Sequence, residues 1–473
     1  MKTFFLNPLR RSLLAGGAAL LLHACAPNQD APTPVVGLNV SRYLAVGDSY
    51  TAGVSAGGLT RNSQEYSYPN LLARQLQLAT PAATFSQPLL EPGTGAGYLD
   101  LVDFTANGLP RARRVPGQAV RRTVFLTNAC TINPDTLRLL ARSATANVLP
   151  QNLGVPGLML SQIEAVGLGN EASVGTGAFN PYFERLLPAS DSRTYLQAVT
   201  TAAGPATFFT FFMGLDDLMP YVRSGGTCGS LPSSSLLKSN ARKILDVLTA
   251  GGRPGIISRL PAVTALPLLR QGKGTEVEAR LQAFYGDKAL LYIEDPFNPG
   301  MSQRISDKDY VLATALPRLG QPTPVPVGTA TLMLPYGRDA RSPIRNADVL
   351  DDASELSRIS GLISNYNTNT TASTGLGLEA LAKAYKLPII DVSLSLNTLD
   401  VNALFANVAN TISINGVIYT AEPVRGNFFS LDSYTLSPRG NGLLANAFIT
   451  AINKAYRSNI PSIDVNNLPT VSR

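Results

Sequence analysis

A serine in a short turn between a strand and a helix is the first residue of the chain that could do chemistry. The apolar run Arg42–Gly47 predicts a strand, and Asp48 and Ser49 follow it directly, with Gly53 shortly after. In doubly wound folds, ligands bind at the carboxyl ends of parallel strands, which is where this serine would lie. The start of the next helix would also direct backbone N–H groups at a developing negative charge. The turn therefore predicts a nucleophile or ligand site, and an N-capping turn without chemistry is the simpler alternative.

The histidine and cysteine content limits the chemistry that this serine could take part in. The single histidine, His23, lies in an N-terminal stretch that we expect to be removed, so a histidine-based zinc site and a Cys-His hydrolase are excluded. Cys130 and Cys228 have neither metal-binding nor catalytic spacing. In an oxidising compartment they could pair and close a loop of about 100 residues, and two buried, unpaired thiols are the equal alternative. Neither a metal nor an organic cofactor is predicted.

Three further segments resemble, together with this turn, the sequence blocks of a known enzyme family. They are Asn152–Gly157 (NLGVPG), Phe211–Asp217 (FFMGLDD) and Leu431–Gly440 (LDSYTLSPRG), and they follow Gly47–Tyr50 (GDSY) in order along the chain. The four segments are similar to the blocks of the SGNH, or GDSL, hydrolases, a family of esterases and lipases. The resemblance implies a three-layer α/β/α fold of flavodoxin-like type with a parallel sheet. It also implies the hydrolysis of carboxylic esters without a metal or cofactor.

The same resemblance implies roles for individual residues. Ser49 corresponds to the family's nucleophile and Asp432 to the acid that orients its base, and the N–H groups of Ser49 and Gly154 would form the oxyanion hole. The family's histidine base corresponds to Thr435, and its oxyanion-hole asparagine corresponds to Asp216. A threonine hydroxyl is far too weakly basic to accept a proton near neutral pH. An ionised Asp216 would repel the oxyanion unless burial keeps the carboxyl protonated.

Two functions from different classes follow from these departures. In the first, the chain is an ester hydrolase in which Asp432 or Asp216 accepts the Ser49 proton, directly or through water. In the second, the hydrolase fold is kept without most of its chemistry, and the cleft binds a ligand or partner in the cell envelope. The loss of both the family's histidine base and its oxyanion-hole asparagine favours the second function. The retention of Ser49 and Asp432 favours the first. A structural role in an envelope assembly is a third interpretation.

The N-terminus has the parts of an export signal. Basic residues at positions 2, 10 and 11 precede the apolar stretch Leu13–Leu22, which is too short to span a membrane. The run Leu22–Cys25 (LHAC) resembles the bacterial lipobox, in which the cysteine is lipidated and becomes the first residue of the mature protein. We therefore expect a lipoprotein signal peptide over residues 1–24, lipidation of Cys25 and a Pro-rich tether over residues 25–36. An ordinary signal peptide with a chance cysteine is the alternative.

Composition and export together define the expected partners. The hydrophobic share of 45% is enough for a sizeable core, which excludes intrinsic disorder. The formal charge is +7, but no RNA-binding aromatic motif is present, so nucleic acid is not an expected partner. The protein is predicted to be anchored by its lipid to the bacterial cell envelope, at the outer membrane, on the periplasmic or cell-surface side. The expected partners are that membrane and an ester-bearing small molecule, lipid or acylated glycan.

Strand-like and helical segments alternate through residues 37–473, which predicts one α/β domain with helices on both faces of a parallel sheet. Strands are expected at residues 42–47, 206–213, 255–260, 290–293 and 388–392, and helices at 68–78, 234–250, 351–366, 379–385 and 437–456. Two stretches of weak periodicity, near 81–150 and 295–348, are expected to be long insertions in this domain. Two domains that meet near residue 295 are the alternative.

Overall fold

The structure of the chain is a computed structural model, and it contains a central parallel sheet. It describes residues 37–105, 109–126, 135–143, 148–175, 178–189, 191–286, 288–391 and 411–471. The sheet has five parallel strands in the order β15 (Ile389–Ile390), β8 (Gly255–Ser258), β7 (Phe208–Phe212), β1 (Tyr43–Gly47) and β6 (Asn152–Gly154). All residues of β1, β7 and β8 are buried, as expected for strands covered on both faces. The predicted α/β class with a parallel sheet is confirmed.

The register of the sheet brings three chain segments to one edge. Gly47 pairs with Phe212 of β7 on one side and with Gly154 of β6 on the other. The last residues of the neighbouring strands β7, β1 and β6 are therefore level with one another. As a result, the residues that follow β1, β6 and β7 lie together at the carboxyl edge, where ligands bind in sheets of this type.

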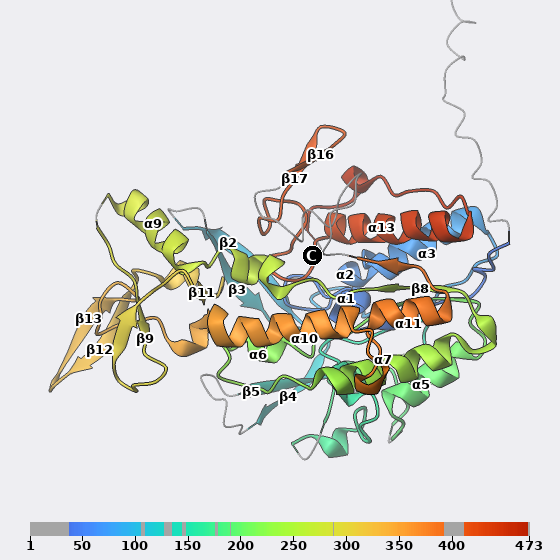
Figure 1. Cartoon of the computed structure of the whole chain (residues 1–473), viewed down its shortest axis with the longest axis horizontal. Coiled ribbons are helices and arrows are strands. Elements are labelled where there is room, and N and C mark those ends of the chain that lie inside the picture. The colour runs from blue at the N-terminus through green and yellow to red at the C-terminus, as the bar shows by residue number, and fades with distance from the viewer. Residues whose placement is uncertain are drawn as a thin grey trace, which may run out of the picture.

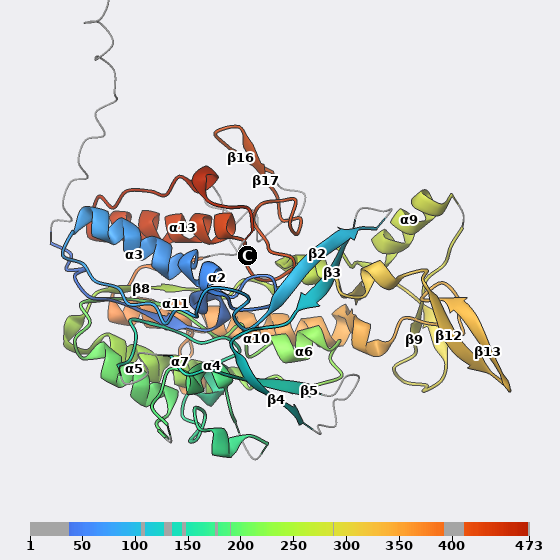
Figure 2. The same cartoon turned by 180° about the vertical axis from the view of Figure 1, so that it is seen from behind.

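Helices cover both faces of the sheet. On one face lie α3 (Tyr68–Ala79) and α13 (Pro438–Tyr456), whose Tyr68 and Phe448 rings stack with centroids 4.8 Å apart. The other face is covered by α5 (Tyr195–Ala203) and α7 (Ser234–Leu248). Two further helices, α10 (Ser357–Thr368) and α11 (Leu378–Tyr385), pack against α7. Figures 1 and 2 show α3 and α13 on one side of β8 and α5 and α7 on the other.

The predicted helices form, but one begins later than expected. The predicted helix over residues 351–366 begins at Ser357, because a π-helical turn occupies Asp352–Leu356 after β14 (Val349–Asp351). The remaining helices are α1 (Ser49–Ala52), α2 (Arg61–Glu65), α4 (Pro181–Glu184), α6 (Met219–Arg223), α8 (Pro267–Arg270) and α9 (Gly274–Tyr285). Near the C-terminus, β16 (Ile412–Ile414) and β17 (Val417–Tyr419) form a hairpin.

The two predicted insertions contain antiparallel hairpins. In the first, β2 (Tyr98–Phe104) pairs with β3 (Pro110–Val115), and β4 (Val120–Leu126) pairs with β5 (Asp135–Leu140). In the second, the pairs are β9 (Tyr292–Glu294) with β10 (Ser302–Arg304), β12 (Pro322–Val327) with β13 (Ala330–Pro335), and β11 (Asp309–Val311) with β14. The strand predicted at residues 290–293 was therefore wrongly placed in the central sheet, since β9 pairs with β10 and forms an isolated bridge from Ile293 to Ile344.

The second insertion has a small apolar core of its own. Side chains from α9 and from the hairpins around it form this core, among them Val277, Leu281, Ile293, Val311 and Ile344. Figure 1 shows these elements projecting to one side of the central sheet. The large core around the sheet is a separate cluster, which includes β1, β7, β8 and the helices on both faces.

Several predictions fall on parts of the chain that the structure does not describe. The signal peptide, Cys25 and the tether through residue 36 lie outside the described residues, and so does Cys130. Lipidation and the Cys130–Cys228 disulfide therefore stay predictions. Among the helices of the described ranges, none is long and apolar enough to cross a bilayer.

Candidate active site

The turn after β1 is fixed to the turn after β7 by a buried carboxylate. Asp48 Oδ2 accepts hydrogen bonds from the backbone N–H groups of Gly214 at 3.0 Å and Leu215 at 3.1 Å, and Oδ1 accepts from Tyr50 N–H at 3.4 Å. The turn also requires Gly47, because a Cβ there would lie 2.0 Å from Thr51 Oγ1 and 2.2 Å from the Phe212 carbonyl oxygen. Asp48 thus holds the two turns together.

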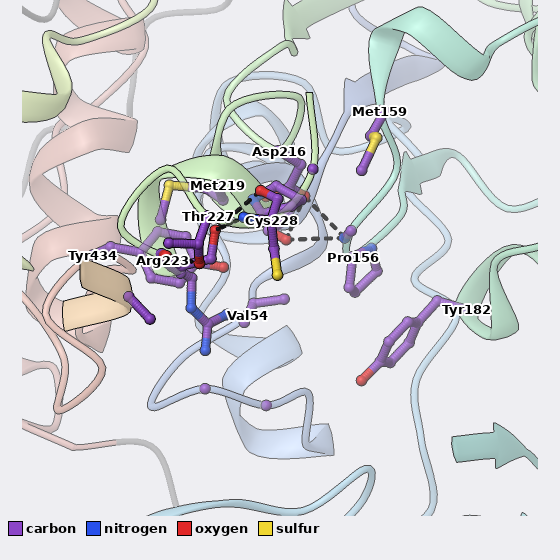
Figure 3. Close-up of a pocket in the computed structure, with 18 of the residues that line it drawn as sticks. Val54, Pro156, Met159, Tyr182, Asp216, Met219, Arg223, Thr227, Cys228 and Tyr434 are labelled. Atoms are coloured by element: carbon purple, nitrogen blue, oxygen red, sulfur yellow. Dashed lines mark hydrogen bonds between the residues drawn. The ribbon is translucent and has the colours of Figure 1, made fainter. Parts of the chain in front are cut away.

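Ser49 and Asp216 meet at this junction. The Ser49 hydroxyl donates to Asp216 Oδ2 at 2.5 Å, and the Ser49 backbone N–H donates to the same oxygen at 3.0 Å. The Gly157 backbone N–H reaches the same oxygen at 2.9 Å and the Ser49 Oγ at 3.1 Å. Figure 3 shows these bonds between the turns that follow β1, β6 and β7. Three donors therefore converge on one carboxylate oxygen.

The buried carboxyl groups of this junction have raised pKa values. Burial raises the pKa of Asp216, and the hydrogen bonds from Ser49 and Gly157 and the charge of Arg223 partly offset that rise. Burial and the neighbouring Asp216 raise the pKa of Asp48 well above its ordinary range. Burial also raises the pKa of Asp217 to about 6. The two oxygens of Asp217 accept from the N–H groups of Leu160 and Ser161, so that this residue holds the loop after β6.

The glycine that donates to Ser49 is Gly157, and the prediction of Gly154 is corrected. The Gly154 N–H donates to Asn152 Oδ1 at 2.8 Å and is not available to a ligand. Gly154 serves packing, because a Cβ there would lie 2.3 Å from the Ala52 nitrogen. Asn152 braces the turn, since its Nδ2 donates to the Thr51 carbonyl oxygen at 3.0 Å. Both glycines belong to one short motif, and only the course of the turn decides which N–H faces Ser49.

Asp432 and Thr435 hydrogen-bond to each other but not to Ser49. The Thr435 hydroxyl donates to Asp432 Oδ2 at 2.5 Å, and its backbone N–H donates to Oδ1 at 2.8 Å. Asp432 Oδ2 also accepts from the Gly57 N–H at 2.6 Å. Within the described residues, neither side chain bonds to Ser49 or lines the pocket that contains it. The predicted acid thus holds position 435 at the spacing of the family motif, while the hydroxyl there does not reach the nucleophile.

Tyr434, which the sequence analysis did not single out, is the residue of this loop that lies beside Ser49. Its side chain lines the same pocket as Ser49, and its ring centre lies 6.5 Å from that of Tyr50, the residue after the serine. Burial, followed by the nearby charges of Asp216 and Asp432, raises the pKa of Tyr434 well above its ordinary value. The phenol is therefore neutral and can donate a hydrogen bond, but it cannot act as an anionic base.

A pocket of about 820 Å³ opens above Ser49 and Asp216. Its walls come from distant parts of the chain, including Gly157, Tyr182, Arg223, Arg345 and Tyr434. Figure 3 shows Met159 and Tyr182 on one side and Arg223 and Tyr434 on the other. Cys228 also lines this pocket. A volume of this size admits a small organic molecule.

A metal site is not apparent in the described part of the chain. The residues described include no group of three or more His, Cys, Asp or Glu side chains that could hold a metal ion. Around Ser49, the structure shows a hydroxyl bonded to a carboxylate oxygen beside two backbone N–H donors. Comparisons with models of protein families, with curated proteins and with solved structures gave no match to the chain.

Proposed function

We propose that the chain is a serine hydrolase of the SGNH/GDSL type that acts on carboxylic esters, with Ser49 as nucleophile and Asp216 in place of the family's histidine base. The observation that carries this proposal is the 2.5 Å hydrogen bond from the Ser49 hydroxyl to Asp216 Oδ2. The order of the four family-like segments supports it, because three of them follow neighbouring parallel strands. The three-layer SGNH fold is part of the same proposal.

Asp216 accepts the proton that Ser49 loses as it attacks the ester carbonyl carbon. A general base works best when its pKa lies near the working pH, and burial raises the pKa of Asp216 in that direction. A carboxylate is still a much weaker base than an alkoxide. We therefore expect hydrolysis to be slower than with a well-placed histidine, by about 10²–10⁴-fold.

The same proton transfer prepares the oxyanion site. In the resting state, the Ser49 and Gly157 N–H groups are directed at Asp216 Oδ2. Once Asp216 carries the proton, it is neutral and a weaker acceptor, so these two donors can turn to the carbonyl oxygen as it becomes negative. The repulsion expected between Asp216 and an oxyanion is removed in the step that creates the oxyanion.

The remaining steps of ester hydrolysis use Asp216 and Ser49 again. Protonated Asp216 returns its proton to the departing alkoxide, which leaves an acyl ester on Ser49. Water then attacks this ester while Asp216 accepts a proton from the water. The bond between the acyl carbon and Ser49 Oγ breaks, Asp216 returns that proton to Oγ, and the acid product leaves with both residues restored. Tyr434, whose pKa burial raises well above its ordinary value, stays neutral in the pocket wall throughout.

A second candidate function is ligand binding without turnover in the cell envelope. It is favoured by the hydrogen bonds already present in the site, because the backbone N–H groups of Ser49 and Gly157 both donate to Asp216 Oδ2. A ligand carbonyl would have to displace that oxygen before the donors could stabilise an oxyanion. In either case, we propose export and a lipid anchor at Cys25, on the basis of the N-terminal sequence.

The two functions are separated by ester hydrolysis and by covalent labelling. Wild-type protein should hydrolyse a short 4-nitrophenyl ester slowly at pH 7–8, and a fluorophosphonate should label Ser49. Ser49→Ala should lose both signals, while Ser360→Ala, at an exposed serine of α10, should keep them. Hydrolysis no faster in wild type than in Ser49→Ala, with no labelling, would leave ligand binding as the function.

A further inference from the structure

An arginine in the wall of the pocket has no acidic partner. Arg223 is the last residue of α6 and lines the same pocket as Ser49. Its guanidinium carbon lies 5.9 Å from the centre of the Tyr434 ring, and Figure 3 shows the side chain reaching from α6 toward Val54. Within the described ranges it forms neither an ion pair nor a side-chain hydrogen bond. Stacking on a ring leaves the N–H edge of a guanidinium free to bind an anion.

Two further arginines add positive charge on the same side of the pocket. Arg114 of β3 donates to the carbonyl oxygens of Gly57 at 2.7 Å and Ala96 at 3.1 Å, and Gly57 lines the pocket. Burial lowers the pKa of Arg114, and the nearby charges of Arg138 and Arg223 lower it further. Arg114 is thus near enough to Arg138 of β5 and to Arg223 of α6 for their charges to act on it.

The neighbouring acids do not neutralise this group. Residues 98–142 contain seven arginines and three aspartates. Two of those aspartates, Asp103 and Asp100, are bound to Arg111 and Arg113. Asp348, in the pocket wall, is bound to Arg318 and Arg345. Asp216 lies beside Ser49 and is engaged by that serine and Gly157. The pocket therefore has unpaired positive charge next to a nucleophile.

We propose that the pocket selects esters that carry a carboxylate group, which Arg223 binds while the ester carbonyl lies at Ser49. A planar guanidinium binds a carboxylate through two parallel hydrogen bonds, so Arg223 would also orient the ester. Arg114 and Arg138 strengthen the local positive potential and attract the anion to the pocket. The inference rests on the proposed function for the reaction, but its binding step is independent of turnover.

The test compares two esters that share the same reacting group: mono-4-nitrophenyl glutarate, which carries a free carboxylate, and its methyl ester, in which a methyl group removes the charge. Wild-type protein should have a KM for the charged ester lower by about 5–10-fold, and the preference should shrink in high salt. Arg223→Gln should remove the preference. Arg358→Gln is the matched control, because Arg358 of α10 stacks on Tyr221, 5.8 Å from the ring centre, and does not line the pocket.

Binding is measured separately on Ser49→Ala protein, with monoethyl glutarate as the ligand and calorimetry as the readout. If wild type hydrolyses neither ester, but this ligand binds and Arg223→Gln weakens its binding by about 5–10-fold, the hydrolase proposal fails and the carboxylate site stands. The site is overturned if monoethyl glutarate does not bind, or if Arg223→Gln leaves its binding unchanged. Equal KM values for the two esters in wild type would also overturn it.

Discussion

At the scale of single residues, one carboxylate oxygen has two tasks. Asp216 Oδ2 accepts a hydrogen bond from the Ser49 hydroxyl at 2.5 Å. It also accepts hydrogen bonds from the backbone N–H groups of Ser49 and Gly157, the two donors that could stabilise an oxyanion. An asparagine amide could donate into such a site but could not accept the proton. In the proposed hydrolase, the aspartate would therefore act as a base at a position where the family has an oxyanion donor.

Part of this site could be predicted from the sequence. The turn after the first apolar strand singled out Ser49, and the resemblance to the family's third block singled out Asp216. Gly157 and Tyr434 were not predicted, since backbone geometry decides which N–H or ring faces the serine. Gly157 has a φ of +68°, a conformation that the sequence alone does not reveal.

The pH dependence of hydrolysis should report Asp216. Only the ionised carboxylate can accept a proton, so kcat/KM should fall as the pH falls through the pKa of Asp216. Because burial raises that pKa, the inflection should lie above the ordinary aspartate value of about 3.9. The measurement is a pH–rate profile corrected by the Ser49→Ala protein. A profile that stays flat to pH 4 would contradict the assignment.

Position 435 offers a test of the family resemblance. The Thr435 hydroxyl bonds to Asp432 Oδ2, so an imidazole at this position would have an acid to orient it. In the Asp216→Asn background, Thr435→His should raise ester hydrolysis by about 10²-fold, because a base and a neutral hole donor are both restored. Ser49→Ala added to these changes should abolish the gain. A folded double variant with no gain would mean that position 435 does not face the serine.

At the scale of elements, the sheet was predictable and the hairpins were not. The runs that form β1, β7 and β8 are almost continuously apolar, which is typical of strands buried on both faces. In contrast, β3 has four exposed residues in a row, and β12 is rich in proline, so neither has the alternation of a half-buried strand. These hairpins pair only within themselves, and the sequence gives no pattern that would separate them from loops.

The turn after β6 can be tested by a glycine substitution with a matched control. The Cβ of an alanine at position 157 would lie 3.9 Å from Asn180 Nδ2, an ordinary contact, but its φ of +68° would be strained, so the turn should relax and move its N–H away from Ser49. Gly157→Ala should reduce kcat by at least about tenfold, part of the 10²–10³-fold typical of a lost donor. Gly175→Ala is the control, because it also has a positive φ (+79°) with open space but lies outside the pocket. Equal activity in the two variants would exclude Gly157 as a donor.

At the scale of the whole molecule, the pocket depends on segments that are far apart in sequence. Ser49 follows the first strand, Arg345 belongs to the second insertion, and Tyr434 precedes the last long helix. The second insertion therefore forms part of the pocket wall through Arg345, Ala347 and Asp348, whereas no described residue of the first insertion lines the pocket. This role of the second insertion could not be read from periodicity, because it depends on how the insertion folds back over the sheet edge.

The attachment of the molecule to a membrane is tested by lipid labelling. Cys25 follows a short apolar stretch and a small residue, as in a lipobox. Metabolic labelling with a fatty-acid analogue should therefore mark the wild-type protein, and Cys25→Ser should lose the mark. Cys228→Ser serves as the control, since that cysteine lies in the pocket wall. Equal labelling of wild type and Cys25→Ser would exclude the anchor.

The most direct test of the central claim is the rate of ester hydrolysis by Asp216→Asn. If Asp216 is the proton acceptor of Ser49, kcat/KM for a 4-nitrophenyl ester should fall by at least about 10²-fold, to the level of Ser49→Ala. Asp307→Asn, at an exposed position outside the pocket, should match wild type, and equal melting temperatures would show that the variants are folded. An Asp216→Asn protein that hydrolyses the ester as fast as wild type, or faster, would contradict the account.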